Sequence, residues 1–177
     1  PIASSAASDV YKRQDQNLID NFHKKVRRGR SAALNMVITE TGAGKAVGQV
    51  LPELQGKLTA NAVRVPTPNV SLAIINLRFA KDITLEELND FLRQKAFHSD
   101  LKEQIGFTNS PEVVSTDFVG DRHAGIIDSA ATIVNGNKCV LYVWYDNEFG
   151  YTAQLLGLAK EMVGLTYQRY PNFSEST

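Results

Sequence analysis

One stretch of the sequence combines a predicted helix start with an arginine that can bind an anion. A helix is predicted from Thr41 to Pro52, because apolar residues recur there at spacings of three and four and proline ends a helix. Thr41 is the expected N-cap, and Gly42 leaves the amides of the first turn open, where the helix dipole places about half a positive charge. Arg64, on a strand predicted over residues 58–65, carries a planar group of five N–H donors. We therefore predict that Thr41, Gly42 and Arg64 bind one phosphate-like anion.

A second candidate site is the segment 145–151, YDNEFGY, between a predicted strand and a predicted helix. Polar side chains at the carboxyl end of a strand, beside a helix start, are well placed to bind a ligand. A turn that caps the helix explains the same residues equally well.

Other patterns of catalytic chemistry are missing from the sequence. The single cysteine, Cys139, has apolar neighbours in a predicted strand, which is typical of a buried, inert thiol. The three histidines lack the Cys, Asp or Glu spacing of a metal site, so no bound metal is expected. No catalytic residue is therefore assigned from the spacing of residues.

Composition narrows the class of ligand. The 177 residues have a formal net charge of zero and a pI of about 7.3, so no basic field favours nucleic acid or an anionic membrane. No run of eighteen apolar residues predicts a membrane span. One cysteine excludes an internal disulfide and agrees with a reducing compartment, so a cytoplasmic location is expected. A small neutral or anionic ligand is the better expectation.

The chain is predicted to hold one folded domain over residues 15–165. Residues 1–14 are rich in Ser and Ala and show no periodicity, so we expect a lead-in outside the fold, and residues 166–177 are expected to form a tail. A basic segment follows the lead-in within residues 15–31. It is either a solvated loop or a loop that contacts phosphates or a partner subunit.

The order of the predicted helices and strands, most of them joined by hairpins, indicates an α+β fold with a mixed, mostly antiparallel sheet. A strand over residues 70–79 is apolar on both faces and is therefore expected in the centre of the sheet. Thr84 and Glu87 form a capping box that begins a helix, and residues 98–111 are expected to be irregular. Further short strands are predicted at 113–115, 124–128, 131–134 and 138–145, with a hairpin turn at 135–136 and a last helix over 151–165.

Three motifs, in order and at similar spacing, resemble the catalytic domain of phosphorylating glyceraldehyde-3-phosphate dehydrogenase. They are the segment from SAALNMVITETGAGKAVGQVLPELQG to KLTANAVRVPTPNVS, then VVSTDFVGD, then WYDNEFGY. The resemblance covers about residues 15–165. It implies a C-terminal domain in which helices pack on one face of the mostly antiparallel mixed sheet.

The resemblance also implies a reaction. The family oxidises glyceraldehyde 3-phosphate with NAD and inorganic phosphate to 1,3-bisphosphoglycerate and NADH, through a cysteine thiolate and a thioester. NADP as the cofactor is not excluded, and the intact enzymes of the family are homotetramers. Glyceraldehyde 3-phosphate and inorganic phosphate are thus the implied partners of the intact protein.

Several residues take roles from the resemblance. Thr41 and Gly42 resemble part of the inorganic phosphate site, and Arg64 resembles the arginine that reaches both phosphates. The other implied roles are a second phosphate-binding arginine at Arg27, the nicotinamide-binding asparagine at Asn147, a neighbouring tyrosine at Tyr151, and an S-loop over residues 15–31 that lines the cofactor site and the tetramer interface.

Two departures from the family pattern limit what this polypeptide is expected to do. The nucleophilic cysteine and the dinucleotide-binding domain precede the matched region in the family, and Cys139 is not at the nucleophile's position. The base histidine is expected near Val10, where none stands. We therefore expect a fragment that is inactive by itself. The alternative is a non-catalytic phosphate-binding or subunit-assembly module.

Overall fold

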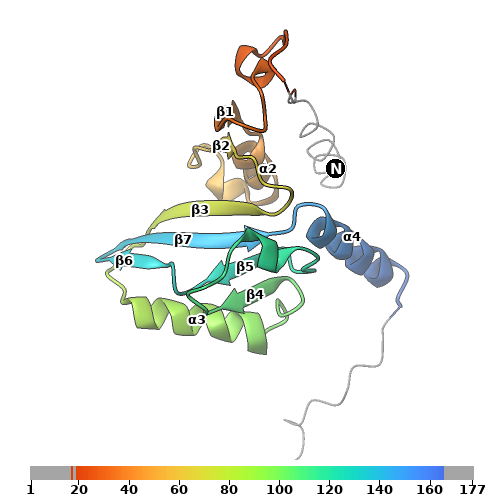
Figure 1. Cartoon of the computed structure of the whole chain (residues 1–177). Helices are drawn as coiled ribbons and strands as arrows, with labels where there is room; N and C mark the ends of the chain where they lie inside the picture. The colour runs from red at the N-terminus through yellow and green to blue at the C-terminus, as the bar shows by residue number, and fades with distance from the viewer. Residues whose placement is uncertain (1–16, 18, 166–177) are drawn as a thin grey trace, which may run out of the picture. The chain divides into compact units, whose positions relative to one another are not determined.

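The computed structural model describes residue 17 and residues 19–165, which form two compact units (Figure 1). One unit extends to Pro68 and the other begins at Asn69. The predicted lead-in at residues 1–14 and the tail at residues 166–177 lie outside the described residues.

The first unit is organised around a short antiparallel pair of strands, β1 (Val37–Glu40) and β2 (Asn61–Arg64). Val37 is opposite Arg64, and Glu40 is opposite Asn61. The helix α2 (Ala43–Val50) follows β1 directly, and the 3-10 turns η1 (Val26–Gly29) and η2 (Pro52–Leu54) complete the unit. The helix and the strand predicted at the sequence level are therefore both present.

Two details of the first unit differ from the prediction. The helix begins one residue later than expected, so Gly42 rather than Thr41 is the N-cap, and no side chain caps it from that position. The apolar residues of α2 were expected to form a buried face, but Gly48 is the one buried residue of the helix. Periodic apolar spacing shows that a helix needs a covering surface, and it does not show where that surface lies.

The second unit is an α+β layer structure. Its order along the chain is β3 (Ser71–Arg78), α3 (Leu85–His98), β4 (Ile105–Thr108), η3 (Ser115–Phe118), β5 (Gly125–Asp128), β6 (Ile133–Asn135), β7 (Lys138–Tyr145) and α4 (Phe149–Met162). The strands form one five-stranded sheet in the order β3-β7-β5-β4, with β6 also paired to β7.

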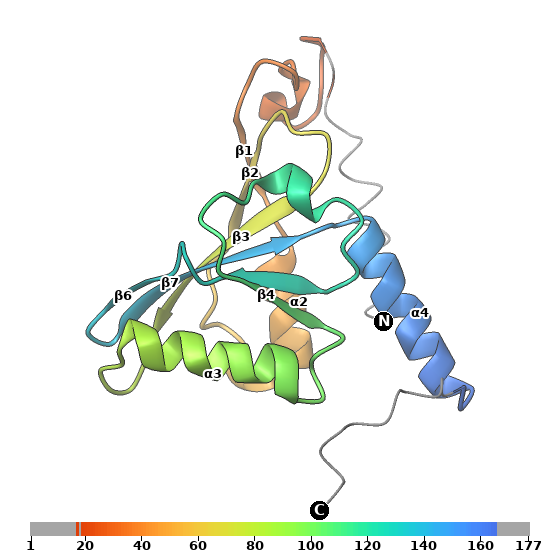
Figure 2. The same cartoon turned by 60° about the horizontal axis from the view of Figure 1, so that its bottom comes forward.

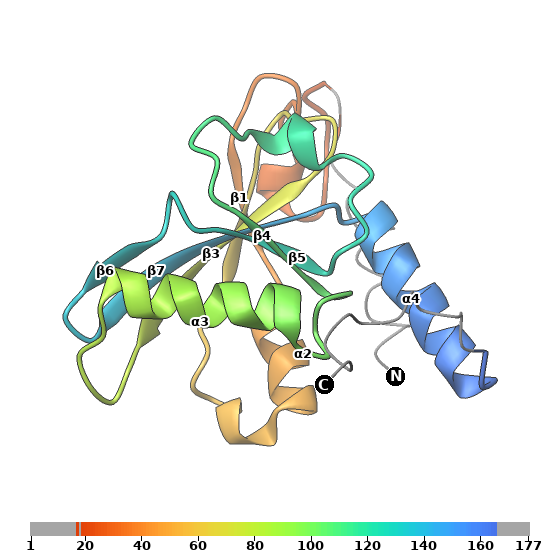
Figure 3. The same ribbon diagram turned by 90° about the horizontal axis from the view of Figure 1, so that it is seen from below.

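The sheet is mixed and mostly antiparallel, as predicted. The strands β3, β5 and β6 all run antiparallel to β7, and the one parallel pair is β4 with β5. The helix α3 lies across one face of the sheet, and α4 extends from the carboxyl end of β7 beside it (Figures 2 and 3). The α+β fold class is therefore confirmed.

Two apolar clusters hold this unit together. Alternate residues of β7 face opposite sides, so Cys139 and Leu141 pack with Leu88 of α3 on one face. On the other face, Val70, Phe118 and Ile126 form a smaller cluster whose partly buried members include Trp144. The 3-10 turn η3, which carries Phe118, thus contributes to the second face.

The start of α3 shows how the local sequence fixes an element. Thr84 Oγ1 accepts a hydrogen bond from the amide of Glu87 (3.1 Å), and Glu87 Oε2 accepts one from the amide of Thr84 (2.8 Å). This is the predicted capping box, and the two bonds satisfy donors that a helix start leaves open.

Three predictions about the second unit were wrong. The strand β3 lies at an edge of the sheet among the described strands, not in its centre, and its apolar side chains stay partly exposed, with Ile74 57% exposed. The predicted strand over residues 113–115 is absent, because Asp117 accepts a hydrogen bond from the amide of Val114 and the chain turns into η3. The strand β4 was missed inside the region expected to be irregular.

No helix in the described part of the chain is both long enough and apolar enough to cross a membrane.

Candidate functional site

The predicted anion-binding residues lie at the two ends of the β1–β2 pair. Thr41 follows Glu40 at one end, and its Oγ1 accepts a hydrogen bond from the amide of Ala43 at 3.2 Å. Gly42 is exposed and has open space around its α-carbon. The helix start is therefore accessible on its glycine side.

Arg64 lies at the other end of the same pair, opposite Val37. Thr41 is four residues after Val37, which is about 13 Å of extended strand at roughly 3.3 Å per residue. An extended arginine side chain covers only part of this distance. The side chain lines a shallow cavity with Ala32, Asn35 and the segment 65–68. Convergence of Arg64 with Thr41 and Gly42 on one anion therefore stays a prediction.

The basic residues of η1 differ in their surroundings. Arg27 is exposed, whereas Arg28 is buried, with 8% of its surface accessible. Lys25 Nζ contacts Glu40 Oε2 at 2.9 Å, and this hydrogen bond, with the charges of Lys25 and Arg28, lowers the pKa of Glu40. Because Glu40 directly precedes Thr41, the ion pair between Lys25 and Glu40 lies next to the start of α2 in the sequence. Sequence reasoning singled out Arg27 and gave no weight to the burial of Arg28.

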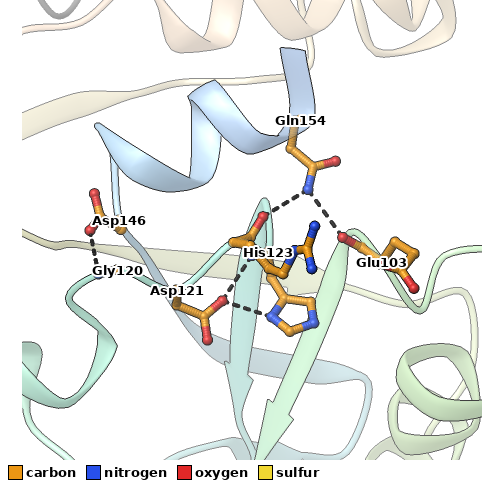
Figure 4. A network of polar contacts seen from close by, with 7 residues as sticks. Glu103, Gly120, Asp121, His123, Asp146 and Gln154 are labelled. Carbon is orange, nitrogen blue, oxygen red and sulfur yellow. Dashed lines mark hydrogen bonds and ion pairs between the residues drawn. The ribbon is translucent and has the colours of Figure 1, made fainter. Parts of the chain in front are cut away.

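In the second unit, Asp146 anchors the junction between β7 and α4. Its carboxylate is 2% exposed and accepts four hydrogen bonds. Oδ1 receives the amides of Glu148 (2.9 Å) and Phe149 (2.8 Å), which caps the first turn of α4. Oδ2 receives the amide of Gly120 (2.8 Å; Figure 4) and Nδ2 of Asn69 (3.0 Å).

The hydrogen bonds determine the charge state of Asp146. Burial by itself would raise the pKa of this carboxyl group, but the bonds from the amides of Gly120, Phe149 and Glu148 and from Asn69 outweigh it and lower the pKa below its ordinary value. The group is therefore a fixed carboxylate that joins three segments of the unit, namely Asn69, Gly120 and the start of α4.

Asn147, the predicted nicotinamide-binding residue, is the next residue along the chain. Its Oδ1 accepts a hydrogen bond from Ser71 Oγ at 2.9 Å, and Ser71 is opposite Tyr145 in the β3–β7 register. With Oδ1 engaged, Nδ2 is the end of the carboxamide that can donate to a ligand.

Tyr151 lies in the first turns of α4 and is partly buried. The helix is held to the neighbouring loops one turn further along, where Gln154 Nε2 donates to the carbonyl oxygens of Arg122 (2.9 Å) and Glu103 (3.1 Å; Figure 4). The approach is close at Gly150, where a Cβ atom would lie 2.6 Å from the carbonyl oxygen of His123. The candidate cofactor residues Asn147 and Tyr151 thus lie on a helix start that is fixed at several points.

Cys139 is buried as the sequence predicts. It is 2% exposed in the cluster beneath α3, and burial raises the pKa of its thiol. A thiol with a raised pKa is a weak nucleophile near neutral pH. Within residues 17 and 19–165, no group of three or more His, Cys, Asp or Glu side chains is arranged to hold a metal ion.

The segment 145–151 was predicted either to bind a ligand or to cap the helix, and Asp146 does cap the first turn of α4. Sequence reasoning missed Asn69 and Ser71. The bonds from Asn69 and Ser71 span 77 and 76 residues of chain, and no local pattern indicates them.

Known proteins that are similar to this chain belong to the family that its three sequence motifs resemble. The family described as "Glyceraldehyde 3-phosphate dehydrogenase, C-terminal domain" matches residues 9–147, a range that begins inside the predicted lead-in. A glyceraldehyde-3-phosphate dehydrogenase-like protein of Pseudomonas aeruginosa is 63% identical over 157 residues, which is 89% of this chain and 34% of that protein.

Two further relatives are named glyceraldehyde-3-phosphate dehydrogenase. That of Borreliella burgdorferi is 44% identical over 152 residues, covering 84% of this chain and 45% of the relative. That of Priestia megaterium is 45% identical over 147 residues, covering 82% and 43%. The chain thus spans between a third and a half of the length of these relatives. It belongs to the glyceraldehyde-3-phosphate dehydrogenase family and corresponds to the C-terminal domain of that family.

Proposed function

We propose that the protein to which this chain belongs is a phosphorylating, NAD-dependent glyceraldehyde-3-phosphate dehydrogenase. The chain contributes groups that orient the nicotinamide and bind phosphate. The observation that carries this proposal is the carboxamide of Asn147, which is held by Ser71 at 2.9 Å beside the start of α4. A fixed carboxamide is suited to pair with the carboxamide of nicotinamide.

The proposal that Asn147 binds the nicotinamide group is tested by ligand binding to the purified chain. Nicotinamide mononucleotide is titrated against the 15N-labelled protein, and the resonances of Asn147 and Tyr151 are followed. We expect both to shift while the resonances of α3, such as that of Asn89, stay in place. If no resonance of the α4 start moves at the highest usable concentration, the assignment of Asn147 is wrong.

The phosphate part rests on the first unit. We propose that Thr41, Gly42 and Arg64 bind inorganic phosphate or the phosphate of the substrate, with Arg27 as the second arginine. Arg28 is 8% exposed and its charge is among the causes that lower the pKa of Glu40, so Arg28 is tested beside Arg27.

Phosphate binding by this chain is expected to be weak, with a dissociation constant of about 1 mM or higher, equivalent to roughly 4 kcal/mol. Phosphate titration by NMR tests it with Arg64→Ala, Arg27→Ala and Arg28→Ala. The matched control is Arg93→Ala, which removes an exposed arginine paired with Asp90 on α3. If Arg64→Ala leaves the phosphate-induced shifts unchanged, Arg64 has no part in the site.

The 177-residue polypeptide by itself is proposed to be inactive. Its single cysteine is buried and has a raised pKa, so no accessible thiolate is present to attack an aldehyde. The direct test is an assay of NADH formation with glyceraldehyde 3-phosphate, NAD and phosphate. Turnover above a buffer blank, abolished by Cys139→Ser, would overturn this part of the proposal.

Exposed apolar residues favour a second role, assembly with other subunits. Ile74 of β3 is 57% exposed, and Met162 of α4 is 79% exposed. Large apolar side chains on a surface are typical of interfaces. Sedimentation equilibrium tests this role, and a strictly monomeric chain at about 100 µM, a concentration at which a modest interface associates, would argue against it.

A further inference from the structure

The segment 69–71 connects the backbone at the start of β3 with the junction between β7 and α4. Val70 has a φ of 70°, a left-handed conformation that β-branched residues rarely adopt. Its side chain is buried with Phe118 and Ile126. The residues on either side of it, Asn69 and Ser71, each donate a hydrogen bond to the junction.

The two bonds reach adjacent residues but act on different parts of them. Asn69 Nδ2 donates to the carboxylate of Asp146 (3.0 Å), which is itself bonded to the amides of the α4 start. Ser71 Oγ donates to the carboxamide oxygen of Asn147 (2.9 Å). Asp146 therefore fixes the backbone on which Asn147 stands, and Ser71 fixes the direction of its side chain.

The direction of that carboxamide decides which ligand it can select. An asparagine whose oxygen accepts a bond from a hydroxyl presents its amino group to a ligand, and an amino group only donates. If the side chain were turned by 180°, it would present an acceptor instead. A fixed amino group selects a carbonyl oxygen over an amine.

The strained backbone supports a functional reading of this contact. A non-glycine residue in the left-handed region costs of order 1–3 kcal/mol and persists where surrounding contacts hold it in place. Here the contacts on both sides of the strained residue converge on the candidate cofactor residue and its neighbour.

We propose that Ser71 is a positioning residue of the nicotinamide site, whose hydroxyl holds the carboxamide of Asn147 with Nδ2 directed to the carbonyl oxygen of the ligand. This inference rests on the proposed function of Asn147. Ser71 itself does not contact the reacting atoms.

The test compares Ser71→Ala with Ser71→Thr in the full 177-residue chain. Alanine removes the hydroxyl, and threonine keeps it and should rescue. The matched control is Ser99→Ala, since Ser99 is also partly buried and donates its hydroxyl hydrogen bond to the carbonyl of Lys95 at the end of α3.

The first measurement needs no ligand. The order parameter of the Asn147 side-chain amide is measured by 15N NMR relaxation, because the bond from Ser71 is accepted by Oδ1 and restrains the orientation of the whole carboxamide. In Ser71→Ala we expect the order parameter to fall to that of a flexible group, below about 0.6. Ser71→Thr and Ser99→Ala should match the parent chain. An unchanged order parameter in Ser71→Ala would overturn the positioning role, whatever the ligand.

The second measurement is titration with nicotinamide mononucleotide. We expect Ser71→Ala to weaken binding by roughly three- to tenfold, and Ser71→Thr to restore it. Equal binding by Ser71→Ala and the parent chain would contradict the inference. If the parent chain itself shows no shift at Asn147, the proposed function fails and so does the nicotinamide part of this inference. A lowered order parameter of Asn147 in Ser71→Ala would then still show that Ser71 restrains the Asn147 side chain.

Discussion

Replacing Asp146 with asparagine tests whether its carboxylate holds the second unit together. Asparagine keeps one oxygen for the amides of Glu148 and Phe149, but its amino group would face two other donors, the amide of Gly120 and Nδ2 of Asn69. A buried donor left without an acceptor costs about 1–3 kcal/mol.

The side chain of Asn69 can relieve part of this cost. Its Oδ1 is buried and has no hydrogen-bond partner among the described residues, so a rotated amide could accept a bond from the new amino group. The amide of Gly120 would remain unsatisfied, and the bonds that remain would lose their charge-assisted character. We therefore expect Asp146→Asn to lower the free energy of unfolding by about 2–4 kcal/mol at pH 7.

Urea denaturation followed by tryptophan fluorescence measures this change. The reporter is well placed, because Trp144 is the single tryptophan and stacks on Phe118 within the same unit. Asp90→Asn is the matched control. Its carboxylate is exposed and pairs with Arg93, so we expect a change within about 0.5 kcal/mol.

The pH dependence gives an independent check. The pKa of Asp146 in the folded protein lies below its ordinary value of 3.8, so the carboxylate contributes its full stabilisation above that value and loses it as the pH falls through the folded pKa. The gap between the parent chain and Asp146→Asn should therefore be constant from about pH 5 to pH 8 and narrow below about pH 4. A loss of less than about 1 kcal/mol at pH 7, or an equal gap at pH 3 and pH 7, would refute the reasoning.

Three further outcomes are expected from the packing. Gly106→Ala would place a Cβ atom 2.9 Å from Ile126 Cγ1 and should cost about 1–3 kcal/mol in urea denaturation, whereas Gly157→Ala in α4 meets nothing within 4 Å and should stabilise by up to about 1 kcal/mol. Leu88→Ala removes a side chain that is buried between α3 and the sheet and should cost about 2–5 kcal/mol by the same method, and a cost below 1 kcal/mol would place Leu88 outside the core. Cys139 should react with a thiol reagent at least tenfold more slowly in native buffer than in urea, and equal rates would show that the thiol is accessible.

Elements fixed by local interactions could be predicted from the sequence. The capping box at Thr84 involves residues three apart, and the run of apolar and aromatic residues over Lys138–Tyr145 marks β7 with its observed bounds. The hairpin turn between β6 and β7 is equally local. In each case the signal and the contact lie in the same short segment.

Elements that depend on distant partners were missed. The strand β4 is four residues long, and its parallel pairing with β5 brings together segments about 20 residues apart. The edge position of β3 was also not visible, because apolar residues on both faces of a strand show that it needs cover and not which strand provides it. The existence of β4 and the edge position of β3 both depend on the topology of the sheet and not on local strand propensity.

In the candidate site, too, local features could be predicted and contacts between distant segments could not. Asn147 and Tyr151 were found because they stand together at a strand end and a helix start. The contacts of Asn69 and Ser71 with that junction exist only after β3 has paired with β7. The direction of the Asn147 carboxamide, on which its chemistry depends, could therefore not be read from the sequence.

The position of β7 in the sheet also determines when the sheet can form while the chain is being synthesised. The strands β3, β5 and β6 all pair with β7, which is the last strand within residues 19–165. At about 5–20 residues per second, roughly sixty residues must be translated after β3 before its partner appears, which takes about 3–12 s. During that interval the apolar β3 has no β7 to pair with, so its unpaired edge and apolar side chains are open to aggregation.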